Sequence, residues 1–217
     1  MANPDNFRTL EGFKTPDGVT NGFFARSGRP EQPISEERKQ ELLSMGFKII
    51  LDLRRLEEVN AKKTGYQGFE YKNITLINTP YKVKSELPLR GEEYYNRCIT
   101  EKNNLSQIFK FLANSKNGII YHCAGGKSRT GVITALLLSL LGVKDDEIIK
   151  DYCRSYLELY DEAVYKEKSP LGEIDIKNFL KLIRQNFKNV ENFLKFTGVT
   201  DEEIALIKEK VVTKAPP

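Results

Sequence analysis

Residues 117–131 read Asn-Gly-Ile-Ile-Tyr-His-Cys-Ala-Gly-Gly-Lys-Ser-Arg-Thr-Gly, and they join a strand pattern to a helix pattern. The segment 119–121 is short and rich in β-forming residues, which is typical of a buried strand. Residues 130–141 are almost wholly apolar over a length that suits a buried helix. A glycine-rich turn is therefore predicted to lead directly from the end of a strand into a helix.

Strand and helix patterns alternate along the rest of the first two thirds of the chain. Residues 47–53 and 73–79 have the pattern of strands, and turn signals among the apolar pieces before residue 27 indicate a hairpin. Ser35 can cap a helix that runs to about residue 45, and residues 92–113 have helical spacing with a division near 103–104. In the last third, helices are predicted over 145–160, 176–187, 190–196 and 201–211.

This alternation predicts an α/β fold. We expect a central, mostly parallel sheet of four or five strands, with helices on both faces and extra C-terminal helices. No repeat or long linker interrupts the pattern, so residues 1–217 are predicted to form a single domain. Such sheets bind ligands beyond the C-terminal ends of their strands, which makes the loop after residue 121 the expected site.

Composition narrows the class of protein. Lys and Arg number 34 against 30 Asp and Glu, a net charge of +4 that is mixed along the chain and predicts no nucleic-acid partner. No apolar run approaches the ~20 residues of a membrane helix, so no integral membrane segment is expected. The first residues lack the basic and apolar regions of a secretory signal, and the odd count of three cysteines favours a reducing compartment. We therefore expect a cytoplasmic protein, and nothing in the sequence indicates its oligomeric state.

The loop after the strand has the features of a phosphate cradle. Its glycines allow successive backbone N–H groups to face one oxyanion, and the following helix adds the partial positive charge of its N-terminus. In that position Cys123 is stabilised as a thiolate and becomes a candidate nucleophile. Arg129, six residues later, can bind two phosphate oxygens with its planar guanidinium. The phosphate-binding candidates are the residues of the loop: Ala124, Gly125, Gly126, Lys127, Ser128 and Arg129.

Two other phosphate-related motifs fit less well. A Walker loop has a glycine six residues before its lysine, and this chain has Tyr121 at that distance from Lys127. The sequence therefore does not favour ATP binding. Arsenate reductases have a similar Cys-x5-Arg loop, but theirs lies near the start of the chain and works with further redox cysteines.

The sequence His122-Cys123-x5-Arg129-Thr130 resembles the signature of the cysteine-dependent protein tyrosine and dual-specificity phosphatases. Two earlier segments, 6–12 (Asn-Phe-Arg-Thr-Leu-Glu-Gly) and 22–28 (Gly-Phe-Phe-Ala-Arg-Ser-Gly), resemble elements of the bacterial tyrosine phosphatases, as does Ile-Leu-Asp-Leu-Arg at 50–54. The resemblance is good from about residue 6 to 160 and less specific beyond. The spacing Gly126-Lys127-x-Arg129 is similar to that of members that also accept phosphoinositides.

The resemblance implies a mechanism that uses no metal and no cofactor. Phosphoryl transfer to Cys123 gives a cysteinyl-phosphate, which water then hydrolyses. In the same family-based interpretation Thr130 hydrogen bonds to the sulfur and His122 orders the loop through neighbouring carbonyls. Phosphotyrosine on proteins is the leading substrate, and phosphoinositides or inositol phosphates are the alternative. Lys127 is a candidate contact for an additional phosphate.

The general acid that protonates the leaving oxygen is the least defined part of the site. Many relatives place an Asp about thirty residues before the cysteine, but residues 84–96 offer only Glu86, Glu92 and Glu93. Other relatives carry an Asp directly before the arginine, where this chain has Ser128. Asp52, at the end of a predicted strand, is the candidate acid; its alternative role is to orient Arg129 or the loop.

Several residues near this site have simpler interpretations. Cys98 and Cys153 are expected to be packing residues, and the i, i+4, i+8 spacing of Tyr152, Tyr156 and Tyr160 predicts a packing stripe. A basic rim is a further possibility, against the usual case of a solvated charged face. Its members are Arg54, Arg55, Lys82 and Lys84. A protein of a different class, a phosphate-binding module without turnover, is the alternative to an enzyme.

Overall fold

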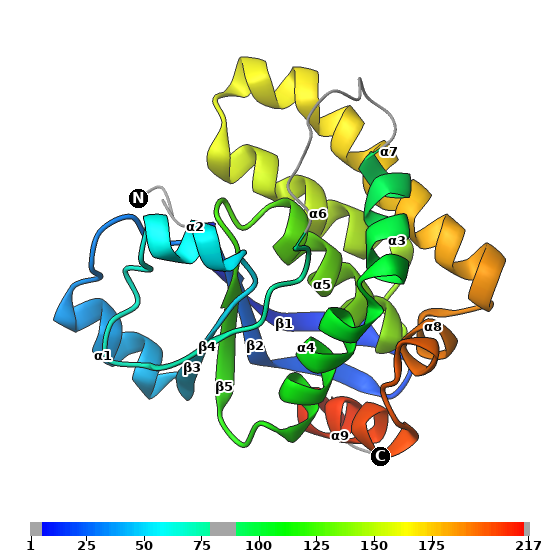
Figure 1. Ribbon diagram of the computed structural model, residues 1–217, viewed down its shortest axis with the longest axis horizontal. Helices are drawn as coiled ribbons and strands as arrows, with labels where there is room; N and C mark the ends of the chain where they lie inside the picture. The colour runs from blue at the N-terminus through cyan, green and yellow to red at the C-terminus, as the bar shows by residue number, and fades with distance from the viewer. Residues whose placement is uncertain (1–5, 79–89, 215–217) are drawn as a thin grey trace.

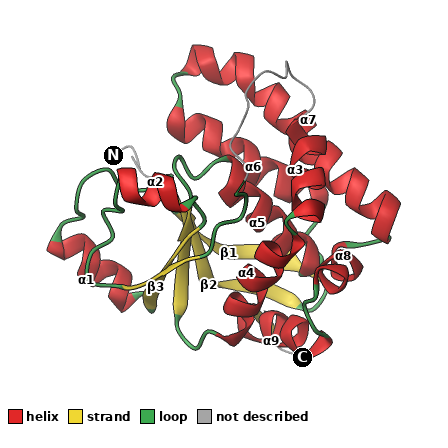
Figure 2. Ribbon diagram, viewed as in Figure 1, coloured by secondary structure: helices red, strands yellow, loops and turns green. Residues whose placement is uncertain are grey.

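The computed structural model describes residues 6–78 and 90–214, and it has an α/β fold in which helices flank one sheet (Figure 1 and Figure 2). The strands are β1 (Arg8–Thr15), β2 (Gly18–Ser27), β3 (Phe47–Asp52), β4 (Glu70–Asn73), β5 (Gly118–His122) and β6 (Val212–Lys214). Their order is β1-β2-β5-β3-β4, and β6 pairs with β2. Strands β2, β5, β3 and β4 run parallel, whereas β1 and β6 are antiparallel to β2. The predicted, mostly parallel sheet is confirmed.

The helices alternate with these strands and then continue alone to the end of the chain. They are α1 (Glu36–Ser44), α2 (Leu56–Ala61), α3 (Arg90–Thr100), α4 (Lys102–Asn114), α5 (Ser128–Leu140), α6 (Asp145–Leu159), α7 (Glu162–Phe187), α8 (Val190–Thr197) and α9 (Asp201–Val211). Ser35 caps α1 as predicted, accepting a hydrogen bond from the N–H of Arg38. Thr200 caps α9 in a capping box with Glu203, which fixes the predicted start of that helix.

The sheet buries a different set of side chains on each face. Alternate residues of its central strands, such as Ile50 and Ile120, pack with Leu42 of α1. The intervening residues, such as Leu51 and Tyr121, join the larger cluster that includes α4, α5 and α6. Helices therefore cover both faces, as predicted, with α1 on one side and most of the C-terminal helices on the other (Figure 1).

The number of strands exceeds the prediction of four or five, because six are present among the described residues. The indicated N-terminal hairpin is confirmed as β1 and β2, paired in antiparallel register. The additional strand is β6, three residues that follow α9 and pair with the start of β2. So short a segment carries no alternation that could identify it as a strand.

The strand predicted over residues 73–79 is wrong in its position. The observed strand β4 covers Glu70–Asn73, and residues 74–78 after it are irregular. The partner strand β3 ends at Asp52, so the chain beyond Asn73 bonds to the loop that follows. The N–H of Ile74 donates to the carbonyl of Asp52 and the N–H of Leu76 to that of Leu53. The apolar residues that suggested a strand are buried there without forming one.

Two helix boundaries also differ from the prediction. The region 92–113 divides at Glu101, slightly before the predicted Asn103-Asn104. Helix α7 begins at Glu162 instead of residue 176 and contains Pro170 in its interior. A proline inside a helix is normally unfavourable because it removes a hydrogen bond and crowds the preceding turn. In the structure the helix nevertheless continues through Pro170, so the predicted start at residue 176 is wrong.

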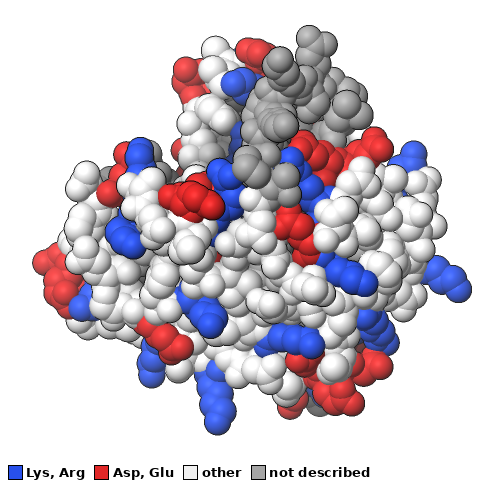
Figure 3. All heavy atoms as spheres, viewed as in Figure 1, with Lys and Arg blue, Asp and Glu red and all other residues white. Residues whose placement is uncertain are grey.

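Charged residues of both signs are interspersed over the face seen in Figure 3. None of the helices within residues 6–78 and 90–214 combines the length and the apolar content needed to cross a membrane.

Candidate active site

The glycine-rich loop lies between β5 and α5, at the C-terminal ends of the parallel strands. Cys123 follows the last residue of β5 and is 4% exposed. The Thr130 hydroxyl donates a hydrogen bond of 3.1 Å to its Sγ atom, the contact that the resemblance implied. The sulfur thus lies against Thr130 in the first turn of α5.

Each carbonyl oxygen from residue 123 to residue 127 is held by a protein group. His122 Nδ1 lies 2.9 Å from the carbonyl oxygen of Cys123, and the N–H of Arg29 donates to that of Ala124 at 2.8 Å. Asn6 Nδ2 donates to the carbonyls of Gly125 (3.2 Å) and Gly126 (3.1 Å), Arg26 Nη2 donates to Gly126 (2.7 Å), and the N–H of Gly131 donates to Lys127 (2.8 Å). Because a trans peptide directs its C=O and N–H in opposite directions, the next N–H of each peptide points away from these donors. This arrangement suits an oxyanion-binding loop.

Gly126 lets the loop approach the end of β2 closely. Its φ is +67°, a value that favours glycine. A Cβ at this position would lie 2.4 Å from the backbone nitrogen of Gly28. The turn therefore needs glycine both for its backbone conformation and for its contact with residues 27–28.

Arg129 is held in a bidentate ion pair with Glu58 of α2. Its Nη1 and Nη2 atoms donate to the two carboxylate oxygens at 2.6 Å and 2.8 Å. Glu58 also accepts a hydrogen bond from the N–H of Arg55 at 3.1 Å, so the start of α2 fixes the carboxylate. A guanidinium has five N–H groups, and the pair uses two of them. The Nε–H and the Nη N–H beside it lie on the other edge of the Arg129 guanidinium, where they can bind a second planar anion.

The Glu58–Arg129 pair is electrostatically strong. Burial alone would favour the neutral acid, but the hydrogen bonds and charge of Arg129 outweigh it and lower the pKa of Glu58 to about 2. Burial likewise disfavours the Arg129 cation, yet Glu58 and the nearby Cys123 raise the pKa of Arg129 above its ordinary value. Both partners are charged at neutral pH.

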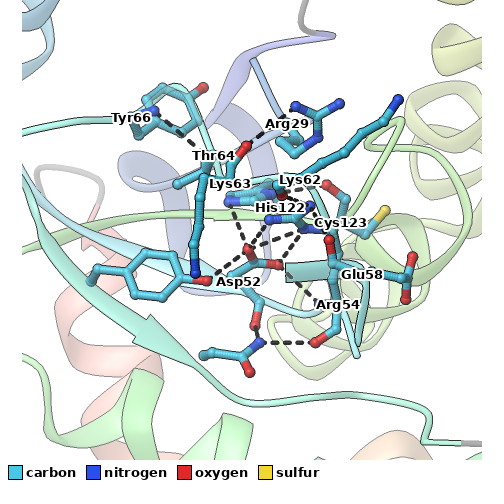
Figure 4. Close-up of polar contacts among 12 residues, drawn as sticks. Arg29, Asp52, Arg54, Glu58, Lys62, Lys63, Thr64, Tyr66, His122 and Cys123 are labelled. Atoms are coloured by element: carbon cyan, nitrogen blue, oxygen red, sulfur yellow. Dashed lines mark hydrogen bonds and ion pairs between the residues drawn. The ribbon is translucent and has the colours of Figure 1, made fainter. Parts of the chain in front are cut away.

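Asp52 lies beneath the loop and faces Arg54, as Figure 4 shows. Its side chain is fully buried, with Arg54 Nη2 at 2.6 Å from Oδ2 and the Tyr71 hydroxyl at 2.9 Å. Burial favours its neutral form, but the hydrogen bonds from Arg54 outweigh it and lower the pKa of Asp52. Asp52 is opposite His122 in the β3–β5 register, and its Oδ2 is 3.6 Å from His122 Nε2. Its contacts are with Arg54, Tyr71 and His122, while Arg129 pairs with Glu58.

His122 is a buried, neutral ring in this arrangement. Burial lowers the pKa of His122 in spite of the nearby Asp52 carboxylate. Its Nδ1–H donates a hydrogen bond to the carbonyl of Cys123. The distance of 3.6 Å between Nε2 and Asp52 Oδ2 is too long for a hydrogen bond.

Lys127 is turned toward the C-terminal end of α6. Its Nζ atom donates to the Tyr160 hydroxyl at 3.0 Å and lies 4.5 Å from the ring centre of Tyr156 and 5.0 Å from that of Tyr160. Tyr152 and Tyr156 are buried in the core, which confirms the predicted packing stripe for these two residues. Ser128 is half-buried as the first residue of α5.

The remaining candidates are dispersed. Glu92 is exposed on α3 and Glu93 pairs with Arg97 of the same helix, while Glu86, Lys82 and Lys84 lie outside the described residues. Arg54 is buried against Asp52 and so does not belong to a basic rim, and half-buried Arg55 pairs with Glu58. Burial raises the pKa of Cys98 to about 12 and that of Cys153 to about 11, as suits packing residues.

Two residues that hold the site were missed by the sequence analysis. Glu58 gave a weak local signal, since an acidic residue in the first turn of a helix is typical of capping. Asn6 stood within the quoted segment 6–12, but nothing local indicated that its side chain reaches the loop. Arg26 belonged to the quoted segment 22–28, and its contact with Gly126 gives that motif a physical role.

The chain belongs to the tyrosine phosphatase family, whose model matches residues 1–213. A tyrosine-protein phosphatase of Nostoc commune is 31% identical over 208 residues, which cover 82% of this chain and 70% of the relative. A relative from Cupriavidus necator is 26% identical over 164 residues, which cover 69% of this chain and 60% of the relative, so the match spans less than two thirds of that protein. Family membership supports a hydrolase of phosphate monoesters.

Two solved structures are similar at low identity. The core catalytic domain of the PP-IP phosphatase SIW14 from S. cerevisiae, in complex with citrate, is 18% identical, with 84% of this chain and 93% of that chain covered and a TM-score of 0.42. The human tyrosine phosphatase-like serine/threonine/tyrosine-interacting protein is 14% identical, with 72% and 93% covered and a TM-score of 0.39. The family assignment depends on the sequence matches alone.

The Glu58–Arg129 pair predicts a pH dependence of stability. The folded-state pKa of Glu58 is about 2, below its ordinary 4.5. The pair therefore stabilises the fold fully above about pH 4.5 and loses this contribution as the pH falls toward 2. We expect the free energy of unfolding of the wild type to exceed that of Glu58→Gln by a constant amount between about pH 5 and 7, and the difference to shrink below about pH 4.5. Urea denaturation at a series of pH values measures both.

Glu57→Gln is the matched control, because it removes an exposed carboxylate from the same turn of α2. It should differ little from the wild type at any pH. A Glu58→Gln deficit that persists undiminished at the acid end would show that the ion pair is not its cause.

Proposed function

We propose that this chain hydrolyses phosphate monoesters through a cysteinyl-phosphate formed on Cys123, with phosphotyrosine in proteins as its substrate. The observation that carries the proposal is the loop itself, in which every carbonyl from residue 123 to 127 has a protein donor. The opposite side of these peptides supplies N–H groups to three equatorial phosphoryl oxygens. Membership of the tyrosine phosphatase family supports the same activity.

The side chains around the loop can divide the work of the reaction. The Cys123 thiolate attacks phosphorus as the ester P–O bond breaks, and the leaving oxygen takes a proton from solvent water. Arg129, fixed by Glu58, uses its Nε side to bind two oxygens of the phosphoryl group in flight. In the second step water attacks phosphorus, the P–S bond breaks, and the Thr130 hydrogen bond stabilises the departing sulfur. Phosphate leaves and the thiolate is restored.

Ala124, Gly125, Gly126, Lys127 and Ser128 contribute their backbone N–H groups to this scheme rather than their side chains. Preorganised amides are effective because they need no rearrangement as charge develops. The N-terminus of α5 adds its partial positive charge at the same point.

For Asp52 we propose the positioning role instead of that of general acid. Its carboxylate is buried, ion-paired with Arg54 and lowered in pKa, so at neutral pH it has no proton to donate. Side chains alternate across a strand, so Asp52 shares the face of Ile50, whereas Cys123 belongs to the cluster on the other face. From there Asp52 can fix the end of β3 by accepting hydrogen bonds from Arg54, next to the point where the N–H of Leu53 donates to the carbonyl of His122 at 2.8 Å.

The choice of phosphotyrosine over a phosphoinositide has support from two sources. The Nostoc commune relative is named a tyrosine-protein phosphatase. In addition, the Lys127 ammonium contacts the Tyr160 hydroxyl and two aromatic rings. These contacts disfavour its binding to the additional phosphate of a phosphoinositide.

We also propose that residues 1–217 act as a single phosphatase domain. One hydrophobic cluster extends from Leu10 of β1 to Val211 of α9. The C-terminal helices therefore share a core with the strands that carry the loop.

A substrate panel on the wild type and Cys123→Ser tests the proposed activity. We expect the wild type to dephosphorylate phosphotyrosine peptides in preference to phosphoinositides in mixed micelles, and Cys123→Ser to lose about a thousandfold or more in kcat while it still binds the peptide. Phosphate release measures turnover, and titration calorimetry measures binding. Vanadate should inhibit the wild type.

Inorganic phosphate release from phosphoinositides alone would make the lipid the substrate. A wild type that binds phosphopeptides but is inert even with p-nitrophenyl phosphate would be a binding module, contrary to the proposal.

Asp52→Asn distinguishes a positioning residue from a general acid. Removal of a general acid slows esters with poor leaving groups far more than p-nitrophenyl phosphate. A positioning residue acts on the loop, so we expect Asp52→Asn to lower kcat for aryl and alkyl phosphates by the same factor, about tenfold. A selective loss with alkyl phosphates would return Asp52 to the role of acid.

A further inference from the structure

Two arginines face each other across the N-terminal hairpin, beneath the loop. The β1–β2 register places Arg8 directly opposite Arg26. Arg26 is fully buried and Arg8 is 8% exposed. Like charges directly opposite one another on two strands are unfavourable, and burial increases the cost. This pair therefore needs a negative partner.

Asp151 of α6 supplies that partner. Arg8 Nε is 2.6 Å from its Oδ1 atom, and Arg26 Nη1 donates to its Oδ2 atom. Ser155, one helical turn later, accepts a hydrogen bond of 3.1 Å from each arginine. Burial favours a neutral Asp151, but the charges of Arg26 and Arg8 outweigh it and lower its pKa. One carboxylate thus joins two cations in the interior.

The cluster formed by Arg8, Arg26, Asp151 and Ser155 is connected to the loop at two points. Arg26 Nη2 donates to the carbonyl of Gly126 at 2.7 Å. Arg8 Nη1 donates to Asn6 Oδ1, which orients the Asn6 amide so that its Nδ2 donates to the carbonyls of Gly125 and Gly126. Every side-chain hydrogen bond given to these two carbonyls within the described residues comes from Asn6 or Arg26.

We propose that Asp151 is a positioning residue for the reaction, because it holds Arg8 and Arg26 together and thereby fixes the Gly125–Gly126 turn with its carbonyls outward and its amides toward the phosphoryl group. The inference rests on the proposed function, since it assigns the turn a role in phosphoryl transfer. Without the carboxylate the two guanidiniums repel each other and their contacts to Asn6 and Gly126 loosen. The loop amides then lose the orientation that stabilises the developing charge.

Asp151→Asn tests the inference, since it keeps the shape of the side chain and removes its charge. We expect kcat for p-nitrophenyl phosphate to fall by about tenfold to a hundredfold, with KM within about threefold of the wild type. The inhibition constant of vanadate, which resembles the transition state, should rise in parallel with the loss in kcat. Thermal denaturation defines the temperature at which each variant is fully folded for these assays.

Asp145→Asn is the matched control. It makes the same substitution on the same helix and removes the carboxylate of another Arg–Asp pair, with Arg184, which has no contact to the loop. Its kcat and vanadate inhibition should match those of the wild type. If Asp151→Asn lowers only the free energy of unfolding and retains the kcat of the wild type per folded molecule, the pair is purely structural and the inference is wrong.

Asn6→Asp provides a second variant, for the case that Asp151→Asn does not fold. It removes the donor to both carbonyls while leaving an oxygen for Arg8, and we expect the same fall in kcat at similar KM. Tungstate binding, measured by calorimetry, gives a readout that needs no turnover, and its dissociation constant should rise about tenfold in both variants. A wild type that neither turns over nor binds tungstate contradicts the proposed function, whereas an active wild type with unaffected variants contradicts the inference alone.

Discussion

The proposed site depends on one constraint in the turn between β5 and α5. The carbonyls of residues 123–127 point toward protein donors, and so away from the side of the turn that would bind phosphate. Donors from β5, from β2 and the segment after it, from Asn6 and from α5 hold these oxygens. Since each peptide is planar, fixing the carbonyls also fixes the amides. The chemistry proposed for Cys123 and Arg129 follows from that backbone arrangement, and much of the surrounding polar network serves to maintain it.

The network explains why segments distant in the sequence contribute to one site. Asn6, Arg26 and Asp151 come from the N-terminal segment, β2 and α6, yet they meet beneath the turn. On the other side of the loop, α2 supplies Glu58 to Arg129. The Gly125–Gly126 turn and Arg129 are thus supported by separate ion pairs, of which Arg8–Asp151 is buried and Arg129–Glu58 is half-buried.

Much of the fold and the centre of the site could be predicted from the sequence, because both depend on local patterns. The strand, the glycine-rich turn and the apolar helix around Cys123 are contiguous, and the caps at Ser35 and Thr200 are local signals. Side-chain alternation even contained the answer for Asp52, since it shares its parity with Ile50 and not with Leu51. The partners of Arg129 and of Arg26 could not be predicted, because they depend on packing between helices and strands far apart in the chain. The long helix α7, with Pro170 inside it, is another case in which tertiary contacts override local preference.

The central claim is that the phosphoryl group is transferred to the sulfur of Cys123 within the loop between β5 and α5. Rapid acid quenching during turnover of an aryl phosphate, followed by digestion and mass spectrometry, tests it most directly. The account predicts a phosphorylated peptide that contains Cys123, formed at a rate no slower than turnover. Steady turnover with no phosphorylated cysteine, or with the phosphoryl group on another side chain, would contradict it.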